Sequence, residues 1–416
     1  MLLQPVQRYS YCCEYSSGLE VVPFSFLARI SDRPTVAARV SYKAPTSEIW
    51  LKYKYHYSNS RSSFNPSSFI LTIQLVQHNP TSIFNMATEY ESVHKKPAGP
   101  GDDRPTARQI ITKEELQGKW TDKTVLITGC SSGIGVETAK TLLETGATLY
   151  LTARDLVKAK VALGDILQSG RAHLLELDLN SFESVRKCAD AFLAKSDRLN
   201  LFIANAGVMA TPEGRTADGF ETQFGTNHLA HFLLIQLLLP TLLRSSSLDY
   251  ESRVVILSSL AHRHGGINFS NLSFEGEYHP WAAYAQSKTA NLYTANELER
   301  RYKKQGLHAL AVHPGLIQTG LMQFMDEETL EQWGADSSIR NLMKSVGQGA
   351  ATTVWAATAK ALEGVGGKYL EDCQIGKPAK AEPADTDPGY APHAFDEAKE
   401  AQLWKKSMEL VAPFLS

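Results

Sequence analysis

From about Lys123 the chain alternates short, continuous apolar runs with amphipathic stretches, and this alternation constrains the fold more than any other feature. The apolar runs have the length of buried strands, and the stretches between them have helical periodicity. Strands are predicted at 124–128, 148–153, 173–179, 199–205, 253–259 and 307–314, and helices at 133–145, 155–168, 181–195, 219–244 and 281–303. The pattern predicts an α/β fold with a single doubly wound, mainly parallel sheet and helices on both faces. Ligands of such sheets bind at the carboxyl ends of the strands.

The segment "TGCSSGIG" (128–135) lies between the first predicted strand and the first predicted helix. Gly129 suits a tight turn, Gly133 the close approach of backbone N–H groups to a pyrophosphate, and Gly135 the close packing of helix on strand. The helix N-terminus adds partial positive charge. A plain glycine-rich turn is the alternative, but the strand–turn–helix context favours a phosphate-binding loop.

The segment "YAQSK" (284–288) opens the helix predicted after the fifth strand. Its spacing places Tyr284 and Lys288 on one helix face, one turn apart. An isolated pair of this kind is usually a solvated surface pair. The functional alternative is a proton-transfer pair, in which the ammonium group lowers the pKa of the phenol.

With "NAG" at 205–207, these segments resemble, in order and spacing, the short-chain dehydrogenase/reductase family over about residues 120–375. The phosphate loop reads T-G-x-x-x-G-I-G rather than G-x-G-x-x-G. The segments "TNHLAHF" (226–232), "LSSLAH" (257–262), "HPGLIQTGL" (313–321) and "GGKYLEDC" (366–373) look like the branch of retinol dehydrogenases and WW-domain oxidoreductase-like proteins. The lead-in from Met86 and the C-terminal tail look like fungal members of that branch.

The resemblance implies an oxidoreductase that moves hydride between a nicotinamide and a carbonyl or alcohol carbon. Tyr284 is then the general acid or base, and Lys288 modulates its pKa and binds the nicotinamide ribose. Alignment with the family favours Ser259 over Ser258 as the ligand of the substrate oxygen. Asn227 corresponds to the family's helix asparagine, which holds a water beside the lysine and completes a proton relay.

The end of the second strand reads "LTARD" and predicts NADP rather than NAD. Ala153 stands where an NAD enzyme of the family carries an acid, and Arg154 can bind the 2′-phosphate in a bidentate manner. Lys158 adds a second cation one turn into the helix. Ser132, where many NADP members carry a basic residue, and the negative Asp155 argue the other way.

The resemblance also implies further cofactor contacts. Asp178 would bind the adenine amino group, although a helix N-cap near Ser181 is an alternative role. Asn205 would line the adenosine side and steady the sheet. Ile317 and Thr319, after "PG" at 314–315, would contact the carboxamide or a phosphate. The full predicted cofactor set is Gly129, Ser131, Gly133, Ile134, Gly135, Arg154, Asp178, Asn205, Tyr284, Lys288, Ile317 and Thr319.

We expect an apolar substrate pocket formed by residues 260–280 and 320–345. Aldehydes, ketones, retinoids, steroids and secondary-metabolite carbonyls all fit this expectation. A non-catalytic NADP-binding protein that reports redox state to a partner is the alternative, although the chain keeps all four catalytic residue types. A sugar-nucleotide epimerase or dehydratase shares the Tyr–Lys pair but has a different phosphate loop. None of the twelve histidines has metal-ligand spacing, so no metal site is predicted.

Composition divides the 416 residues into four parts: an N-terminal extension (1–85), a lead-in (86–121), the NADP-binding domain (122–375) and a helical tail (376–416). Residues 1–85 are rich in serine and tyrosine and poor in acids, which fits a disordered or targeting extension, an accessory region, or an untranslated stretch before Met86. The net charge of −2 offers no field for nucleic acid, and the five scattered cysteines favour a reducing, cytoplasmic location.

The longest apolar run, 232–243, contains Pro240 and is too short to span a bilayer. We interpret it as part of a helix that is buried on more than one side. The helix either pairs across a homodimer, as in related proteins, or packs within its own chain.

Overall fold

The computed structural model describes residues 89–247, 249–384 and 386–415 in full, together with the backbone of five strands before residue 80. The chain forms two units, Met1–Pro80 and Thr81–Ser416. In the first unit, β1 (Arg8–Tyr11) pairs antiparallel with β2 (Phe24–Leu27), and β3 (Ala37–Ala44), β4 (Ser47–Tyr55) and β5 (Leu71–Val76) form a separate antiparallel sheet. Most of residues 1–85 lie outside the described part, so the three readings of this segment stay predictions.

An eight-stranded sheet forms the centre of the second unit, in the order β15-β14-β11-β10-β9-β6-β7-β8. All neighbouring strands are parallel except the β14–β15 pair. The strands are β6 (Thr124–Ile127), β7 (Thr148–Ala153), β8 (Ala172–Glu176), β9 (Leu201–Ala204), β10 (Ser252–Leu257), β11 (Leu307–Val312), β14 (Lys368–Glu371) and β15 (Gln374–Ile375). The predicted α/β fold class with a doubly wound parallel sheet is confirmed.

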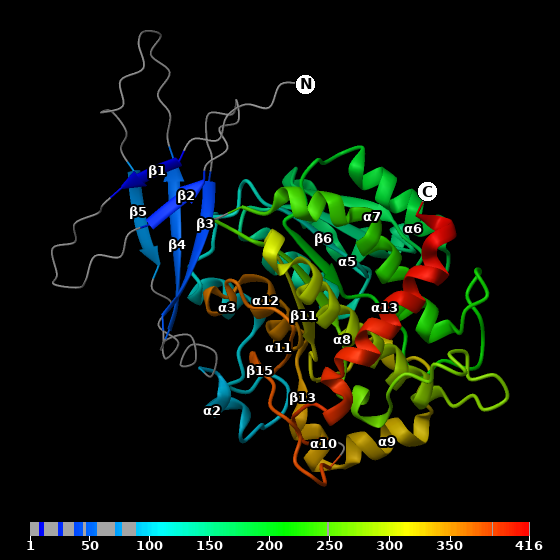
Figure 1. Cartoon of the computed structure of the whole chain (residues 1–416). Coiled ribbons are helices and arrows are strands. Elements are labelled where there is room, and N and C mark those ends of the chain that lie inside the picture. Colours follow the sequence, from blue (N-terminus) through cyan, green and yellow to red (C-terminus); the bar gives the residue numbers. More distant parts are fainter. Residues whose placement is uncertain are drawn as a thin grey trace. The chain divides into compact units, whose positions relative to one another are not determined.

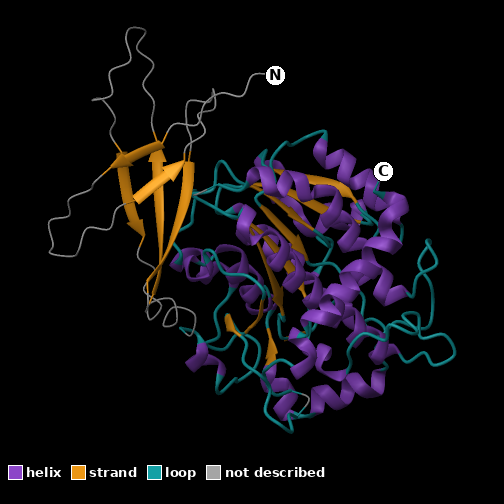
Figure 2. Ribbon diagram, viewed as in Figure 1, coloured by secondary structure: helices purple, strands orange, loops and turns teal. Residues whose placement is uncertain are grey.

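Helices cover both faces of this sheet (Figure 2). Alternate strand residues point to opposite sides, so Leu126 and Phe202 join one core, while Val125 and Leu201 join the other. The first core contains residues of α6 (Phe182–Leu193), α7 (Ala230–Ser245), α8 (Pro280–Tyr302) and α13 (Glu397–Val411). The second contains residues of α3 (Ala107–Lys113), α4 (Gly133–Leu143), α5 (Leu156–Leu163) and α12 (Ala351–Thr358).

Short elements complete the unit. They are α2 (Glu91–His94), α9 (Glu327–Ala335), α10 (Ser337–Leu342), α11 (Val346–Gly349) and the parallel pair of β12 (Leu316–Ile317) and β13 (Met343–Lys344). Short 3₁₀ helices cover Gly164–Ser169, Leu260–His264, Lys303–Gln305, Gly320–Met322, Lys360–Leu362, Pro392–Phe395 and Ala412–Phe414.

The helix predicted at 219–244 begins later than expected. Gly219 has a φ of +86°, and residues 215 and 221 form an isolated β-bridge, so this stretch is a turn. The carboxylate of Glu221 then accepts the N–H groups of Gln223 and Phe224 at 2.8 and 2.6 Å. The helix starts at Phe224 with a π-helical turn, Phe224–Leu229, which continues into α7.

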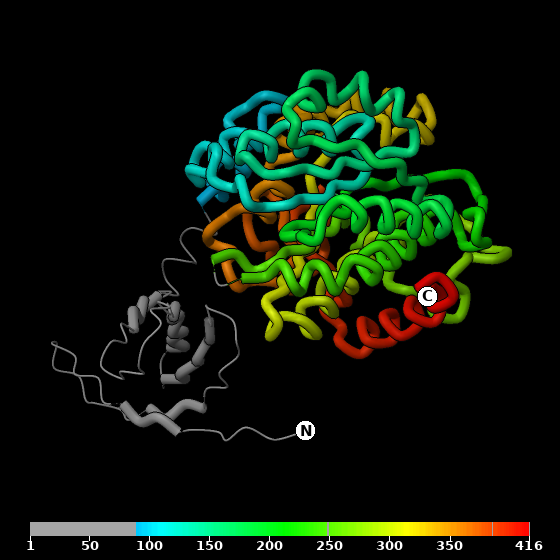
Figure 3. Tube along the Cα trace, turned by 90° about the horizontal axis from the view of Figure 1, so that it is seen from above, coloured from blue at the N-terminus to red at the C-terminus, as the bar shows by residue number. Residues whose placement is uncertain are grey.

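The C-terminal helix α13 packs beside α8 (Figures 1 and 3). It also contacts the helix that carries the apolar run: the rings of Phe232 and Trp404 are 4.9 Å apart, and the His228 ring lies 2.8 Å from the Ser407 hydroxyl. Among the described residues, Phe224–Ser245 is the one helical stretch that is long and apolar enough to cross a membrane, and 67% of its most apolar window is buried inside the fold. Part of its cover therefore comes from its own chain, and a homodimer stays a prediction.

Candidate active site

The phosphate loop follows β6 and has the backbone geometry that its glycines predict. Gly129 and Gly133 have φ values of +77° and +61°, in the region that favours glycine. A Cβ atom on Gly129 would lie 2.8 Å from the Cα of Ala206, and one on Gly135 would clash with the Gly129 carbonyl and the Asn205 amide. Gly129 and Gly135 therefore allow the loop to lie directly against the residues that follow β9.

Asn205 joins this loop to the end of β9. Its amide nitrogen donates to the carbonyl oxygens of Thr128 and Gly129 at 2.8 and 3.3 Å. Its Oδ1 atom is buried and has no hydrogen-bond partner in the described chain. A buried acceptor without a partner beside a glycine cradle fits a dinucleotide, because a ligand donor would satisfy it.

Arg154 is exposed at the end of β7, directly after the buried Ala153. The neighbouring Asp155 is the N-cap of α5, where its carboxylate accepts the Lys158 N–H at 2.9 Å. The helix terminus therefore binds this carboxylate, so its repulsion of a cofactor 2′-phosphate is reduced.

Asp178 is half-buried after β8, and its carboxylate accepts the Asn180 N–H at 3.0 Å. The N-cap of α6 is Ser181, whose hydroxyl accepts the Ser184 N–H at 3.4 Å. The alternative role of Asp178 as the cap of this helix is therefore wrong, and its predicted contact with adenine stays a prediction.

The loop after β11 meets the phosphate loop from the other side. A Cβ atom on Gly133 would lie 3.2 Å from the Cγ2 of Thr319. Ile317 is buried in β12. A Cβ atom on Gly349 would lie 2.5 Å from Ile317 and 3.0 Å from Ile134. The predicted contacts of the nicotinamide end and of the phosphates thus lie next to each other.

Tyr284 and Lys288 lie one turn apart on α8, and both are only 4% exposed. The Lys288 ammonium is 5.5 Å from the centre of the Tyr284 ring and donates to the Leu257 carbonyl at 3.1 Å. The Ser259 hydroxyl acts on the Tyr284 phenol and lowers its pKa. Ser258 is buried and donates to the Lys288 carbonyl at 2.8 Å. The geometry therefore places Ser259 at the phenol and gives Ser258 a structural bond.

Burial dominates the electrostatics of the Tyr–Lys pair. It raises the pKa of Tyr284 to about 12, although the hydrogen bond from Ser259 acts in the opposite direction. It lowers the pKa of Lys288 to about 8. The expected lowering of the phenol pKa by the ammonium is not found in the chain alone, because burial disfavours the phenolate and raises the pKa. At neutral pH the phenol is a proton donor.

Asn227 lies in the π-helical turn and is fully buried. Its Oδ1 accepts the Val208 N–H at 2.8 Å, and its Nδ2 donates to the Val208 carbonyl and the Ser287 hydroxyl, both at 2.9 Å. A Cβ atom on Gly207 would lie 3.1 Å from the Asn227 Oδ1 and 3.5 Å from the Lys288 Nζ. Asn227 is thus held beside the lysine, with both amide protons engaged by the protein.

Sequence reasoning missed a buried network beneath these residues. The Thr128 hydroxyl accepts the N–H groups of Asn205 and Ala206, both at 3.0 Å, so its own proton points to the His231 Nε2 at 2.9 Å. His231 then carries its proton on Nδ1 and donates it to the Asn227 carbonyl at 3.0 Å. Burial lowers the pKa of His231 to about 4, so the ring is neutral. The i,i+4 spacing of Asn227 and His231 was the available signal.

A small apolar cluster surrounds the Tyr284 side chain. Its buried members are Met209, Ala210, Tyr284, Met322 and Met325, packed against Ala261, Leu321, Leu330 and Trp333. The Trp281 ring, 38% exposed, stands edge-on to Tyr284 with the ring centres 6.2 Å apart. Residues 320–345 contribute much of this lining, and the loop after β9, which contributes Met209 and Ala210, was not anticipated.

Within the described part of the second unit, no group of three or more His, Cys, Asp or Glu side chains is placed to hold a metal ion. The thiols of Cys130, Cys188 and Cys373 are buried and free.

The sequence model of the family described as short chain dehydrogenase matches residues 123–330. The chain belongs to the short-chain dehydrogenase/reductase family, as the motifs predicted. It is an NAD(P)-dependent oxidoreductase that acts on CH–OH and C=O groups.

Among its relatives, "Short-chain dehydrogenase/reductase prx1" of Penicillium roqueforti is 47% identical over 78% of this chain and 95% of that protein. Human retinol dehydrogenase 12 is 37% identical over 72% of this chain and 88% of that protein. A solved structure of a putative uncharacterized protein from Mycobacterium paratuberculosis is 35% identical, covers 70% of this chain and 93% of that one, and superimposes with a TM-score of 0.53. The predicted likeness to fungal and retinol dehydrogenase-like members is confirmed.

Proposed function

We propose that this chain reduces an aldehyde or ketone of a hydrophobic compound, with NADPH as the hydride donor. The observation that carries the proposal is a protonated, buried tyrosine that faces an apolar, methionine-rich cluster. When bound, NADPH supplies a hydride, which forms the new C–H bond at the carbonyl carbon. Tyr284 gives its phenolic proton to the carbonyl oxygen, and the product is an alcohol.

The remaining residues position and polarise the substrate. Ser259, bonded to the phenol, donates to the same carbonyl oxygen and stabilises the charge that develops there. Lys288 carries a proton at neutral pH and binds the ribose of the cofactor. Asn227 holds the lysine side of the site through Val208 and Ser287, and the relay water belongs beside it.

The preference for NADPH rests on Arg154. An exposed guanidinium at the carboxyl end of β7 can bind a 2′-phosphate, and the adjacent Asp155 is engaged as a helix cap. Hydrogen bonds between charged groups contribute about 1.5–3 kcal/mol. Arg154→Asp should therefore raise the KM for NADPH by roughly 10- to 100-fold. The difference between the KM values for NADPH and NADH should become smaller. Arg171 is an exposed arginine before β8. As a control, Arg171→Asp should leave the KM values for NADPH and NADH unchanged.

The test measures NADPH oxidation by the purified full-length protein with alkyl aldehydes, retinal, steroid ketones and aromatic ketones. Turnover should collapse in Tyr284→Phe and persist in Tyr302→Phe, a control on the same helix outside the site. Equal activity of wild type and Tyr284→Phe would refute the proposed role of the tyrosine. Tight NADPH binding without turnover on any carbonyl would favour the redox-reporting alternative.

A further inference from the structure

Arg104 is a buried arginine in the lead-in segment, far from the catalytic residues in sequence. It is only 3% exposed. Its guanidinium donates to the carbonyl oxygens of Leu342 at 2.8 Å and Met343 at 2.6 Å, with weaker bonds to Gly99 and Asn341. Because Ser337–Leu342 is α10, Arg104 satisfies carbonyls that the end of this helix leaves free, and its charge suits a helix C-terminus.

A second tie joins the same two segments. The Gln348 side chain, 2% exposed, donates to the carbonyl oxygens of Asp102 and Arg104, both at 3.1 Å. Its Oε1 accepts the Gly101 N–H at 2.9 Å. Residues 98–104 and 341–348 are thus held together by buried polar bonds. We call this arrangement the lead-in clamp.

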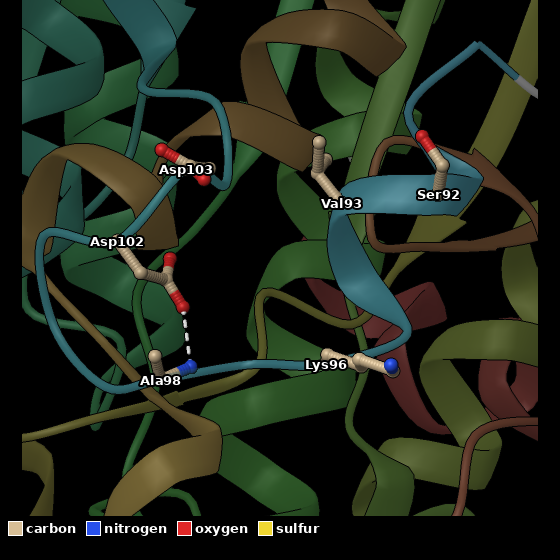
Figure 4. A pocket seen from close by; sticks show the side chains of 6 residues that line it. All are labelled: Ser92, Val93, Lys96, Ala98, Asp102 and Asp103. Atoms are coloured by element: carbon tan, nitrogen blue, oxygen red, sulfur yellow. Dashed lines mark hydrogen bonds between the residues drawn. The ribbon is translucent and has the colours of Figure 1, made fainter.

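Asp102 organises the clamp from within. Its carboxylate accepts the Arg104 Nε–H at 2.8 Å, the Gln348 Nε2–H at 2.9 Å and the Ala98 N–H at 2.8 Å (Figure 4). Burial alone would raise the pKa of Asp102, but the bonds from Arg104 and Ala98 and the charge of Arg104 hold it at about 2, so the carboxylate stays charged. Asp102 and Ala98 also line a hollow of about 280 Å³, and none of its lining residues belongs to the catalytic group.

On one side, the clamp connects to the loop after β11, residues 313–319, which we call the cofactor loop. Met343, whose carbonyl Arg104 binds, begins β13, and β13 pairs with β12, which contains Ile317. The next residue, Lys344, is 5% exposed and bonds Asp372 at 2.7 Å and the Pro314 carbonyl at 3.4 Å. Two residues of one short strand therefore connect Arg104 to the loop that meets the phosphate-binding glycines.

On the other side the clamp leads to the apolar cluster. The chain before Met343 forms α9 and α10, and α9 carries Leu330 and Trp333, which pack against the cluster around Tyr284. We call residues 320–342 the substrate cover. One end of the cover follows Thr319 of the cofactor loop, and the other end is bound by Arg104.

We propose that Arg104 is a positioning residue that sets the placement of both the cofactor loop and the substrate cover. The inference rests on the proposed function and extends it to a residue that touches neither substrate nor cofactor. Both clamped segments lie outside residues 123–330, which the family match covers. A buried arginine with several carbonyl acceptors stabilises one arrangement of the segment that it binds, and small displacements of binding groups reduce productive binding.

The test uses full-length Arg104→Met, which keeps an unbranched apolar side chain but removes all five donors. We expect the Kd for NADPH and the KM for the carbonyl substrate each to rise by about tenfold, while kcat changes by less than about threefold. Arg104→Lys should fall between wild type and Arg104→Met. Arg108→Met is the control, because Arg108 lies on the adjoining α3, is exposed and pairs with Glu144 at the surface.

A purely structural role would lower Tm and leave the Kd for NADPH unchanged at temperatures where the variant is folded, and that result would overturn the inference. Should Arg104→Met fail to fold, Gln348→Met tests the second tie with the same readouts. If wild type itself binds no NADPH, the proposed function fails. If wild type and a folded clamp variant bind NADPH equally, only the present inference fails.

Discussion

At the scale of single residues, the pKa values of the Tyr–Lys pair control how the site responds to pH. Lys288 has a pKa of about 8 and Tyr284 one of about 12, both because of burial. The lysine therefore loses its charge well before the tyrosine loses its proton. Of the two groups, the first to titrate above neutral pH is therefore Lys288, for which we propose a contact with the cofactor ribose.

We expect kcat/KM for carbonyl reduction to be constant near neutral pH and to fall as pH rises through about 8, where Lys288 becomes neutral. The phenol stays protonated over this range, so the acid itself is not lost. The measurement is a profile of kcat/KM against pH, which reports groups of the free enzyme. A decline that persists unchanged in Lys288→Met, at whatever residual rate, would assign the transition to another group.

The two neighbouring serines should differ sharply. Ser259→Ala removes the hydroxyl that we propose donates to the reacting carbonyl oxygen, so kcat should fall by about 10²- to 10³-fold. Ser258→Ala removes a bond to the Lys288 carbonyl, so it should lower the free energy of unfolding by about 1 kcal/mol and leave kcat close to wild type. Kinetics and urea denaturation of both variants check this, and the reverse pattern would exchange the two roles.

Much of the residue-level site was predictable, because Tyr284, Lys288 and the glycines belong to spaced motifs with a physical purpose. The pKa of Tyr284 was not predictable, since it depends on burial that no local pattern shows. The Oδ1 of Asn205, buried and without a partner among the described residues, likewise appears only when the loops of β6 and β9 are placed together.

At the scale of elements, a charged triad lies at the amino-terminal end of β11, the end opposite to the candidate site. His308, near the start of β11, lies 2.8 Å from Glu251 and 3.1 Å from Glu299. Burial alone would lower the pKa of His308, but the hydrogen bonds and charges of the two carboxylates raise it to about 9. This histidine is therefore protonated in the folded chain at neutral pH.

The folded pKa lies above the ordinary value of 6.5, so the stabilisation is complete below about pH 6.5 and is lost as pH rises through about 9. We expect the free energy of unfolding to fall by at most about 3 kcal/mol across this window. Urea denaturation at several pH values, with His308→Gln for comparison, isolates the effect. A difference between the two proteins that does not change with pH would contradict it.

The long strands and helices were predicted well, because their apolar runs are continuous and bounded by glycines or caps. The π-helical start of α7 was not, since the turn at Gly219 and the cap from Glu221 decide where the helix begins. The β14–β15 hairpin was not predicted either. β15 has only two residues, and the two strands form by pairing with each other at the sheet edge rather than from a strong sequence pattern.

At the scale of the second unit, α13 is the element whose position the sequence least reveals. Trp404 on this helix is 7% exposed, its ring lies 4.9 Å from that of Phe232, and the Arg301 guanidinium sits 4.7 Å above it. The contact joins the C-terminal tail to α7 and α8, which are distant in sequence. The predicted division at residue 375 therefore does not separate the tail from the core that it completes.

Trp404→Ala should lower the free energy of unfolding of the second unit by about 3–5 kcal/mol, because it leaves a large cavity between helices. Trp281→Ala, at an exposed site, should lower the free energy of unfolding by less than about 1 kcal/mol. Denaturation followed by circular dichroism checks both. Equal stability of the two variants would mean that α13 contributes little to the core.

Three of the seven methionines of the chain lie against Tyr284. Thioether side chains are flexible and polarizable, so they can adapt to ligands of different shape. A rigid pocket selects ligands by their shape. An adaptable pocket selects them mainly by the apolar surface area that they bury on binding. Across a panel of carbonyl compounds, kcat/KM should therefore follow the oil–water partition coefficient more closely than ring number or branching, and one enzyme should accept both chains and fused rings.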